Sequence, residues 1–328
     1  MTFLRACAGA ALVAALLCIA APGPIAAQTK PAPFEILVSS VGPGAPEWPL
    51  YVGEELGLFA KAGLTVSEST AGNAQNCVNA LVTGDAPLAI LASDIILVAA
   101  SRQLPITYIA PIITIPTYSL VVGPSIKTWN DLRGKVVLVT NKEDITAITL
   151  RKLAQAQKMD WLKDFDILVS GTSQLRTVAL VSGNAQGAML TQPFDVYAQR
   201  QGMHVLARGS DVMRDWISNG IAVNPKWAAA HRPELVRFLS VVRESIAYLY
   251  AHPAESVAIV ARKMRLEPAD IQIAYDGLFG RNGVSRDLIL NEKSLRNVAD
   301  GSVDIGTLPS VPPLAGLIDT SFVRDSRR

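Results

Sequence analysis

Hydrophobic and polar positions follow two alternating periods along the first two thirds of the chain. The short apolar run Phe34–Val38 predicts a buried strand, and residues Leu64–Thr70 predict a second strand. Between them, residues 49–59 have helical spacing with a proline at the start, which predicts a helix that ends before Gly63. Because this alternation continues to about residue 223, the pattern predicts an α/β fold with largely parallel sheets.

From Pro233 onward only the helical period remains. Apolar side chains recur at helical spacing from Leu235 to Leu249. Further helices are predicted to start near Pro253 and to cover about 268–278. The last third of the chain is therefore predicted to be a helical annex, whose Met and aromatic side chains belong to the core.

The first 27 residues show the three parts of a secretory signal peptide. Arg5 supplies a positive charge, residues 6–21 form an apolar run, and small residues reach Ala27 behind a Pro-Gly-Pro break. This run is shorter than the roughly 20 residues of a membrane span, and an uncleaved anchor is the alternative. We therefore expect a secreted protein with a signal peptide at 1–27 and a linker at 28–33.

Composition limits the remaining possibilities. The 328 residues suit two domains of ordinary size, and half of them are apolar, which is enough for a core of normal extent. The formal net charge is only +2, and the basic residues are scattered along the sequence rather than clustered as in a nucleic-acid-binding patch. Because Cys7 and Cys18 fall in the predicted signal peptide, the mature chain keeps only Cys77 and forms no internal disulfide.

A weak internal repeat is the most informative feature of the sequence. Residues 72–90 and 171–189 match with a constant offset of 99, sharing Gly, Gln, Ala-Leu-Val, Gly and two Ala in register. Each copy predicts a Gly-containing loop, a helix that ends near a glycine, and a buried strand. Chance similarity between two such units is the alternative. Otherwise the repeat predicts two similar α/β lobes.

Two such lobes place their candidate ligand contacts at the ends of strands. Ligands of open α/β sheets bind beyond the carboxyl ends of the strands, so facing lobes form a cleft that a hinge can close. The repeat makes Ala92–Asp94 and Thr191–Pro193 the matching strand ends, one in each lobe. The loops at Gly72 and Gly171 are matching helix entrances with free N–H groups.

Four segments resemble one family of binding proteins. Residues 54–66 (EELGLFAKAGLTV) and 80–84 (ALVTG) resemble motifs of the periplasmic proteins that bind nitrate, sulfonates, taurine and thiamine-pyrimidine precursors. Residues 131–137 (DLRGKVV) and 317–323 (LIDTSFV) are similar to two further elements of that family. Each motif is moderately specific, but their order and spacing cover nearly the whole mature chain.

The resemblance implies a type II periplasmic binding protein, with two lobes and a hinge of two crossing strands. It places the first lobe at 34–117, the second at 122–217, and a return to the first lobe with the C-terminal helices at 220–328. The implied hinge strands are Tyr118–Val122 and Gly220–Val223.

The chain departs from the family pattern in two places. Pro87 and Gln186 stand where the family usually has Asp before the strand of each lobe. Residues 141–144 (NKED) replace the small residues that usually open the first helix of the second lobe. Acidic side chains at a helix N-terminus satisfy the helix dipole themselves and repel an anion. This departure argues against a nitrate or sulfonate ligand.

Eight residues are predicted to contact the ligand. Trp48 either stacks on a planar ligand or anchors its loop, and Asn73 and Asn141 either contact the ligand or cap a helix. The full set is Trp48, Asn73, Ser93, Thr117, Tyr118, Thr140, Asn141 and Gln192.

The other five of these residues are polar and sit at predicted strand ends or at the crossover. Ser93 is a small residue with a hydroxyl group, at the end of a predicted strand of the first lobe. Thr117 and Tyr118 lie where the chain first crosses between lobes, and Thr140 and Gln192 are expected to face them from the second lobe.

Catalytic constellations are not found in the sequence. His204, His231 and His252 lack metal-ligand spacing, and Cys77 has no histidine nearby in sequence. Residues 183–187 lack the Gly-Lys-Ser ending of a phosphate loop. The sequence therefore predicts a protein that is not an enzyme and uses no cofactor and no metal.

Together these features predict the periplasmic solute-binding component of an ABC-type importer. The monomer is expected to capture a small organic molecule by cleft closure and then to dock on the permease membrane subunits. A sulfonate, an aromatic carboxylate and a pyrimidine-like molecule remain open as ligands. An enzyme resembling the thiamine-pyrimidine-precursor synthases and a periplasmic ligand sensor remain open as alternative functions.

Overall fold

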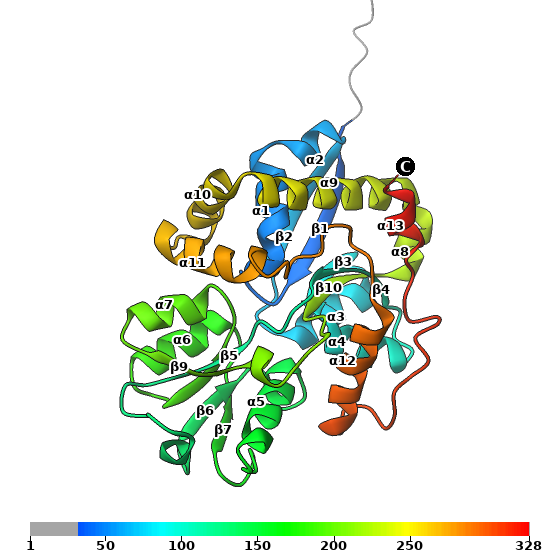
Figure 1. Ribbon diagram of the computed structural model, residues 1–328. Helices are drawn as coiled ribbons and strands as arrows, with labels where there is room; N and C mark the ends of the chain where they lie inside the picture. Colours follow the sequence, from blue (N-terminus) through cyan, green and yellow to red (C-terminus); the bar gives the residue numbers. More distant parts are fainter. Residues whose placement is uncertain (1–31, 328) are drawn as a thin grey trace, which may run out of the picture. The chain divides into compact units, whose positions relative to one another are not determined.

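The computed structural model describes residues 32–327, and all that follows concerns this part of the chain. The predicted signal peptide at 1–27 and most of the linker at 28–33 lie outside the described residues. Within 32–327, no helix is long and apolar enough to cross a membrane. Two five-stranded sheets with flanking helices form this part (Figure 1).

The first sheet has the strand order β2-β1-β3-β10-β4. Strand β1 pairs in parallel with β2 and β3, whereas β10 runs antiparallel to β3 and β4. We call this sheet and the helices packed on it the first lobe. Its strands are β1 (Phe34–Ser40), β2 (Leu64–Thr70), β3 (Leu88–Ala92), β4 (Thr107–Ile113) and β10 (Asn219–Val223).

The second sheet has the matching order β7-β6-β8-β5-β9. Strand β6 pairs in parallel with β7 and β8, and β5 runs antiparallel to β8 and β9. This sheet with helices α5 to α7 is the second lobe. Its strands are β5 (Ser119–Val122), β6 (Val136–Val139), β7 (Asp166–Val169), β8 (Gly187–Leu190) and β9 (His204–Arg208).

The structure confirms the internal repeat. Helix α3 (Ala74–Thr83) precedes β3 as helix α6 (Ser173–Val181) precedes β8. Their first residues differ by 99 positions, as do the first residues of the two strands (173 − 74 and 187 − 88). The two helix-strand units occupy equivalent places in sheets of equivalent order, so the repeat marks the two lobes.

Three further helices follow strands before β10, and one expected helix is divided. The expected helix at 49–59 is two helices, α1 (Trp48–Glu55) and α2 (Leu58–Lys61). Gly57 separates them with a φ of +64°, a left-handed conformation that ends one helix before the next begins. The others are α4 (Ser93–Ser101), α5 (Ile145–Ala156) and α7 (Phe194–Arg200).

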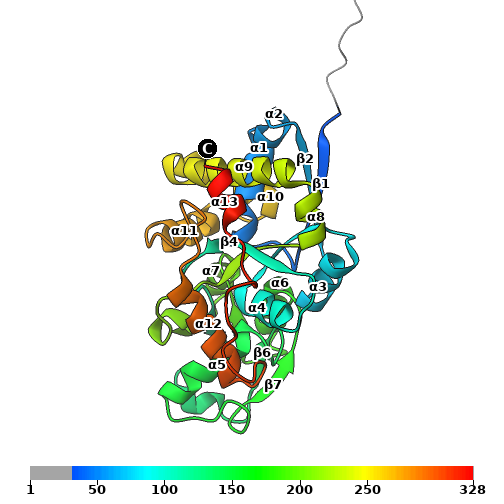
Figure 2. The same ribbon diagram turned by 90° about the vertical axis from the view of Figure 1, so that its right-hand side faces the viewer.

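The predicted helical annex is present after β10. Helix α12 lies beside α4 of the first lobe and α5 of the second (Figure 2), and Lys152 of α5 is ion-paired with Asp304 of α12 at 2.8 Å. The helices of the annex are α8 (Pro225–Ala230), α9 (Arg232–Ala251), α10 (Pro253–Met264), α11 (Pro268–Phe279), α12 (Glu292–Asp304) and α13 (Ser321–Asp325).

The chain crosses between the lobes directly before the two strands expected to form the hinge. Segment 114–118 leads from β4 into β5, and segment 209–218 leads from β9 back into β10. The two segments are hydrogen-bonded to each other, because the N–H of Gly209 donates to the carbonyl of Tyr118 at 2.8 Å. At the other end, the hydroxyl of Ser218 donates to the carbonyl of Ile115 at 2.7 Å.

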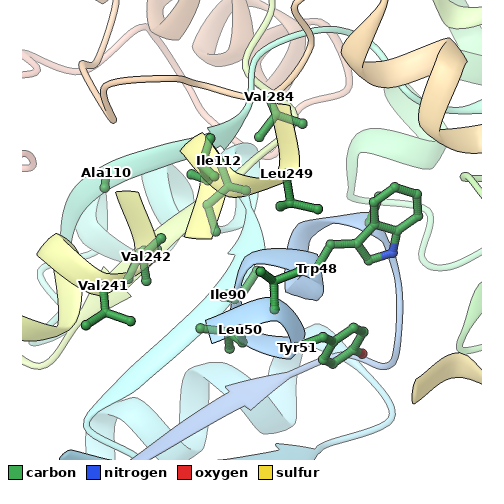
Figure 3. Packing of buried hydrophobic residues seen from close by; sticks show 14 of the residues in the cluster. Trp48, Leu50, Tyr51, Ile90, Ala110, Ile112, Val241, Val242, Leu249 and Val284 are labelled. Carbon is green, nitrogen blue, oxygen red and sulfur yellow. The ribbon is translucent and has the colours of Figure 1, made fainter. Parts of the chain in front are cut away.

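The core of the first lobe lies between its sheet and helices α1, α9, α10 and α11. Figure 3 shows Trp48 and Leu50 of α1 among buried side chains that include Ile90 of β3 and Val242 of α9. The indole of Trp48 stacks on the ring of Phe279 with centroids 6.3 Å apart. Burial of these large apolar surfaces stabilises the lobe to which the C-terminal helices return.

Candidate functional site

A cavity lies between the two lobes at the carboxyl ends of their parallel strands. Its enclosed volume is about 90 Å³. The first lobe contributes the loop after β1 and the end of β3, while the second contributes the residues that follow β6, β7 and β8. Prominent lining residues are Gly42, Glu47, Tyr118, Thr140, Asp144 and Arg176.

Two pairs of backbone loops touch across this cavity. A Cβ atom placed on Gly171 would lie 3.2 Å from the carbonyl oxygen of Gly72, and one on Gly42 would lie 3.1 Å from the Thr172 methyl group. Gly72 and Gly171 are equivalent positions of the internal repeat. The matching helix entrances therefore meet face to face, and glycine permits that approach.

Three buried carboxyl groups stand at or near the cavity. Glu47 and Asp144 line it, and each is only 4% exposed. Asp94, in the first turn of α4, is 2% exposed. The Oε2 atom of Glu47 and both carboxyl oxygens of Asp94 have no hydrogen-bond partner within 32–327. Among the described residues, none of the three carboxyl groups forms a salt bridge.

Burial controls how readily these carboxyl groups ionise. It raises the pKa of Glu47 well above its ordinary value, and the Glu68 carboxylate adds to that shift. Burial also raises the pKa of Asp94 to about 8, with a further contribution from Asp144. Since an unpaired buried carboxylate is costly, both groups favour either a proton or a positively charged partner.

Arg176 is the cation of the cavity, and its own lobe uses most of its donors. The Nε–H donates to the Met189 carbonyl at 2.8 Å, and Nη1 donates to the Ser170 carbonyl at 2.9 Å and to that of Gly171. Nη2 donates to the Ser173 hydroxyl at 2.9 Å. These four bonds leave one of the five N–H donors of the guanidinium for any other group.

Three helix N-termini beside the cavity carry their own caps, whereas α4, whose N-cap Ala92 also lines the cavity, has no side-chain cap but has Asp94 in its first turn. The side chains of Asn73, Asp144 and Thr172 accept hydrogen bonds from first-turn N–H groups of α3, α5 and α6 at 2.9, 2.9 and 3.3 Å, respectively. Capping satisfies part of the positive end of each helix dipole. These three helix ends are therefore already provided with an acceptor or an anion of the chain itself.

Tyr118 lies at the centre of these charges. It is in the first crossing segment and lines the cavity together with Thr140. Burial raises the pKa of its hydroxyl, the positive charge of Arg176 opposes that shift, and the carboxyl groups of Asp144, Asp94 and Glu47 reinforce it. The hydroxyl is therefore a neutral group that both donates and accepts hydrogen bonds.

The structure brings only some of the eight predicted contacts together. Tyr118 and Thr140 line the cavity between the lobes. Thr117 and Gln192 line a second cavity beside α7 and α11, to which Tyr118 also contributes. Whether these residues contact a ligand stays a prediction.

The other four predicted contacts are engaged elsewhere. Trp48 is in the core, which agrees with its role as an anchor, and Asn73 caps α3. The hydroxyl of Ser93 is fully buried and bonded to that of Tyr108 at 2.7 Å. Asn141 accepts from the N–H of Glu143, and because Asp144 is the N-cap of α5, the capping alternative for Asn141 is wrong.

Sequence reasoning missed Glu47 and Arg176 as cavity residues. Nothing in the local pattern marks either as buried, because their surroundings come from distant segments. Asp94 could have been identified from the sequence, because the repeat marks the strand end Ala92–Asp94. Helix α4 begins at Ser93 without an intervening loop, and this turns Ser93 toward Tyr108.

No group of three or more His, Cys, Asp or Glu side chains within residues 32–327 is arranged to hold a metal ion. Cys77, the free cysteine of this part, is buried in α3, and burial raises the pKa of its thiol to about 11.

Asp94→Asn is expected to flatten the pH dependence of stability. The folded protein keeps the Asp94 proton up to about pH 8, whereas an unfolded aspartate releases it near pH 4. The folded state thus binds more protons between these limits, and the free energy of unfolding falls as pH rises, by at most about 1.4 kcal/mol per pH unit.

Urea denaturation of both proteins at pH 5, 6, 7 and 8 measures this effect. The stability of Asp94→Asn relative to wild type should increase toward pH 8. A difference that stays constant across the four pH values would contradict the assignment of a buried proton to Asp94.

Known proteins of similar sequence lead to the same family as the fold. A family model described as NMT1/THI5 like matches residues 47–256, more than half of the chain. YtlA of Bacillus subtilis (strain 168), named as a binding protein, is 22% identical over 281 residues, which is 83% of each chain.

Two solved structures illustrate the similarity of fold. The ligand-binding component of an ABC-type import system from Staphylococcus aureus, with zinc bound, has a TM-score of 0.76 at 13% identity, covering 89% of this chain and 99% of its own. The alkanesulfonate-binding protein SsuA from Xanthomonas axonopodis pv. citri, bound to MOPS, has a TM-score of 0.71 at 15% identity, with coverage of 89% and 99%.

The expected family and the two-lobed α/β fold are confirmed, but the expectation of largely parallel sheets is wrong, because each sheet has two parallel and two antiparallel strand pairs. The two five-stranded sheets of equal order are those of a type II periplasmic binding protein. With the family model spanning most of both lobes, the chain belongs to the NMT1/THI5-like family.

Proposed function

We propose that the chain is the solute-binding component of an ABC-type importer and encloses a small organic molecule between its lobes. One observation carries this proposal: the cavity is lined from both lobes by residues at the carboxyl ends of parallel strands. The binding roles in the names of YtlA and of the two structural relatives support it.

The mechanism is reversible capture without covalent chemistry. The open form admits a ligand, which then contacts both lobes and binds the closed form more tightly. This difference in affinity shifts the population toward closure. Bending occurs at the paired crossing segments 114–118 and 209–218, and the closed protein docks on the permease subunits in the periplasm.

An uptake experiment tests the importer. The mature protein is incubated with a small-molecule extract and desalted, and the retained compound is identified by native mass spectrometry. Deletion of the coding sequence, with the permease genes intact, should abolish uptake of that compound in isotope-labelled form, and a plasmid copy should restore it.

The alternatives give different results in the same experiment. A sensor would leave uptake intact and would change gene expression when the compound is added. An enzyme of the thiamine-pyrimidine-precursor type would contain iron and would convert its substrate. Unchanged uptake in the deletion strain would therefore contradict the importer.

A further inference from the structure

The charged side chains that line the cavity leave one buried acceptor unused and only one N–H donor of Arg176 free. Of the charged residues that line it, Glu47 and Asp144 are acidic and Arg176 is basic. Arg176 already donates four hydrogen bonds to its own lobe, and Asp144 accepts two from Thr146. Glu47, by contrast, is only 4% exposed, and its Oε2 atom has no hydrogen-bond partner within residues 32–327.

Anions are normally bound by paired guanidinium donors or by free helix N-termini. Arg176 has only one N–H left, so it cannot hold a carboxylate or sulfonate through two parallel bonds. The N-termini of α3, α5 and α6 are capped by Asn73, Asp144 and Thr172. The N-terminus of α4 has no side-chain cap, but the buried carboxyl group of Asp94 stands in its first turn. An entering anion would also meet the carboxyl groups of Glu47 and Asp144, with Arg176 as the one cation among the charged lining residues.

The rest of the lining is suited to an organic body. Apolar side chains from both lobes surround the charged groups, and they include Val41, Pro43, Ile90, Ile95 and Ile145. Such walls favour a ligand with a hydrocarbon or aromatic part and one polar end.

Provided that the binding role proposed above holds, we infer that the ligand is a small organic cation whose protonated nitrogen donates N–H bonds to Glu47. The cation supplies the charge partner that this buried carboxylate lacks within residues 32–327. Its apolar part lies against the aliphatic walls, and the Tyr118 hydroxyl accepts or donates a further bond. The raised pKa of Glu47 agrees with this assignment, because an empty closed cavity holds the carboxyl group protonated.

Probes that share one aromatic ring but differ in charge test the inference. Benzamidine is a cation, benzamide is neutral, and benzoate and benzenesulfonate are anions of similar size. Thermal shift at pH 7 followed by calorimetry should rank benzamidine first, with an affinity at least 10-fold above that of benzamide. A small-molecule extract, analysed by native mass spectrometry, should yield a retained compound with a protonated nitrogen.

Variants of Glu47 tie the preference to this carboxylate. Glu47→Gln keeps the shape and removes the charge, so it should reduce benzamidine affinity at least 10-fold and leave benzamide within about 2-fold. Glu47→Asp keeps the charge and should retain the cation preference at lower affinity. Glu35→Gln, at an exposed position of β1, is the matched control and should change neither affinity.

The outcomes separate the two proposals. The inference of a cationic ligand is overturned if the protein prefers benzoate or benzenesulfonate, or if it retains an anionic compound from the extract. Either result leaves the binding role intact. If the cationic and neutral probes bind equally and Glu47→Gln changes neither affinity, only the inference of a cationic ligand is overturned. Binding of no probe and of no compound from the extract overturns the inference together with the proposed function.

Discussion

Replacing Arg176 by methionine is expected to lower the free energy of unfolding by at least about 3 kcal/mol. The side chain is 1% exposed, and its guanidinium bonds the carbonyls of Ser170, Gly171 and Met189. Methionine fills much of the volume but donates nothing, so the buried carbonyl of Met189 and the part-buried carbonyls of Ser170 and Gly171 lose this donor. Each unsatisfied buried acceptor costs about 1–3 kcal/mol.

The same substitution should loosen the loop that meets the first lobe. Gly171 and Ser173 are both held by Arg176, and this segment forms the contact with Gly72. Urea denaturation measures the stability change. Arg133→Met is the control, because Arg133 is half-exposed and pairs with Asp164 at the surface, where such a pair contributes less than about 1 kcal/mol. Equal effects of the two substitutions would contradict the buried network.

Gly171→Leu is expected to weaken ligand binding by on the order of 100-fold, with little effect on the unfolding midpoint. Even a Cβ atom here would lie 3.2 Å from the Gly72 carbonyl, so the longer leucine side chain prevents the two loops from meeting. The backbone of Gly171 is not left-handed, and the residue is only partly buried, so the open lobes accommodate leucine. The substitution therefore acts on closure.

Calorimetry with the tightest compound of the benzamidine series measures this loss. Gln174→Leu is the matched control, because Gln174 is exposed in the first turn of α6, close to the same loop. It should bind as wild type does. Wild-type affinity in Gly171→Leu would show that binding does not require the loops at Gly72 and Gly171 to approach each other.

The fold was predictable because its signals are local in sequence. Strand and helix periods show directly in the order of apolar residues, and the repeat at an offset of 99 maps α3 and β3 onto α6 and β8. Even so, the division of the expected helix at 49–59 was missed. A single glycine with positive φ decided it, and the hydrophobic pattern continues across that position.

The site was less predictable because its chemistry depends on contacts between distant segments. In sequence, Arg176 is a basic residue within an amphipathic helix, and only the fold brings the carbonyls of Ser170 and Met189 to it. Glu47 ends a short 3₁₀ helix directly before Trp48, and nothing in the local pattern marks it as buried. Ser93 and Asp94 are neighbours at the same strand end, and the immediate start of α4 determines which direction each faces.

Pulsed electron spin resonance between spin labels on the two lobes tests the closing cleft most directly. Asn79→Cys on α3 and Val178→Cys on α6 are exposed and equivalent in the repeat, while the buried Cys77 is shielded from the label. With the tightest compound of the benzamidine series, wild type should give one short distance, and Gly171→Leu should keep a longer one. Identical distance distributions with and without the compound, and in both proteins, would contradict a binding site formed by closure of the two lobes.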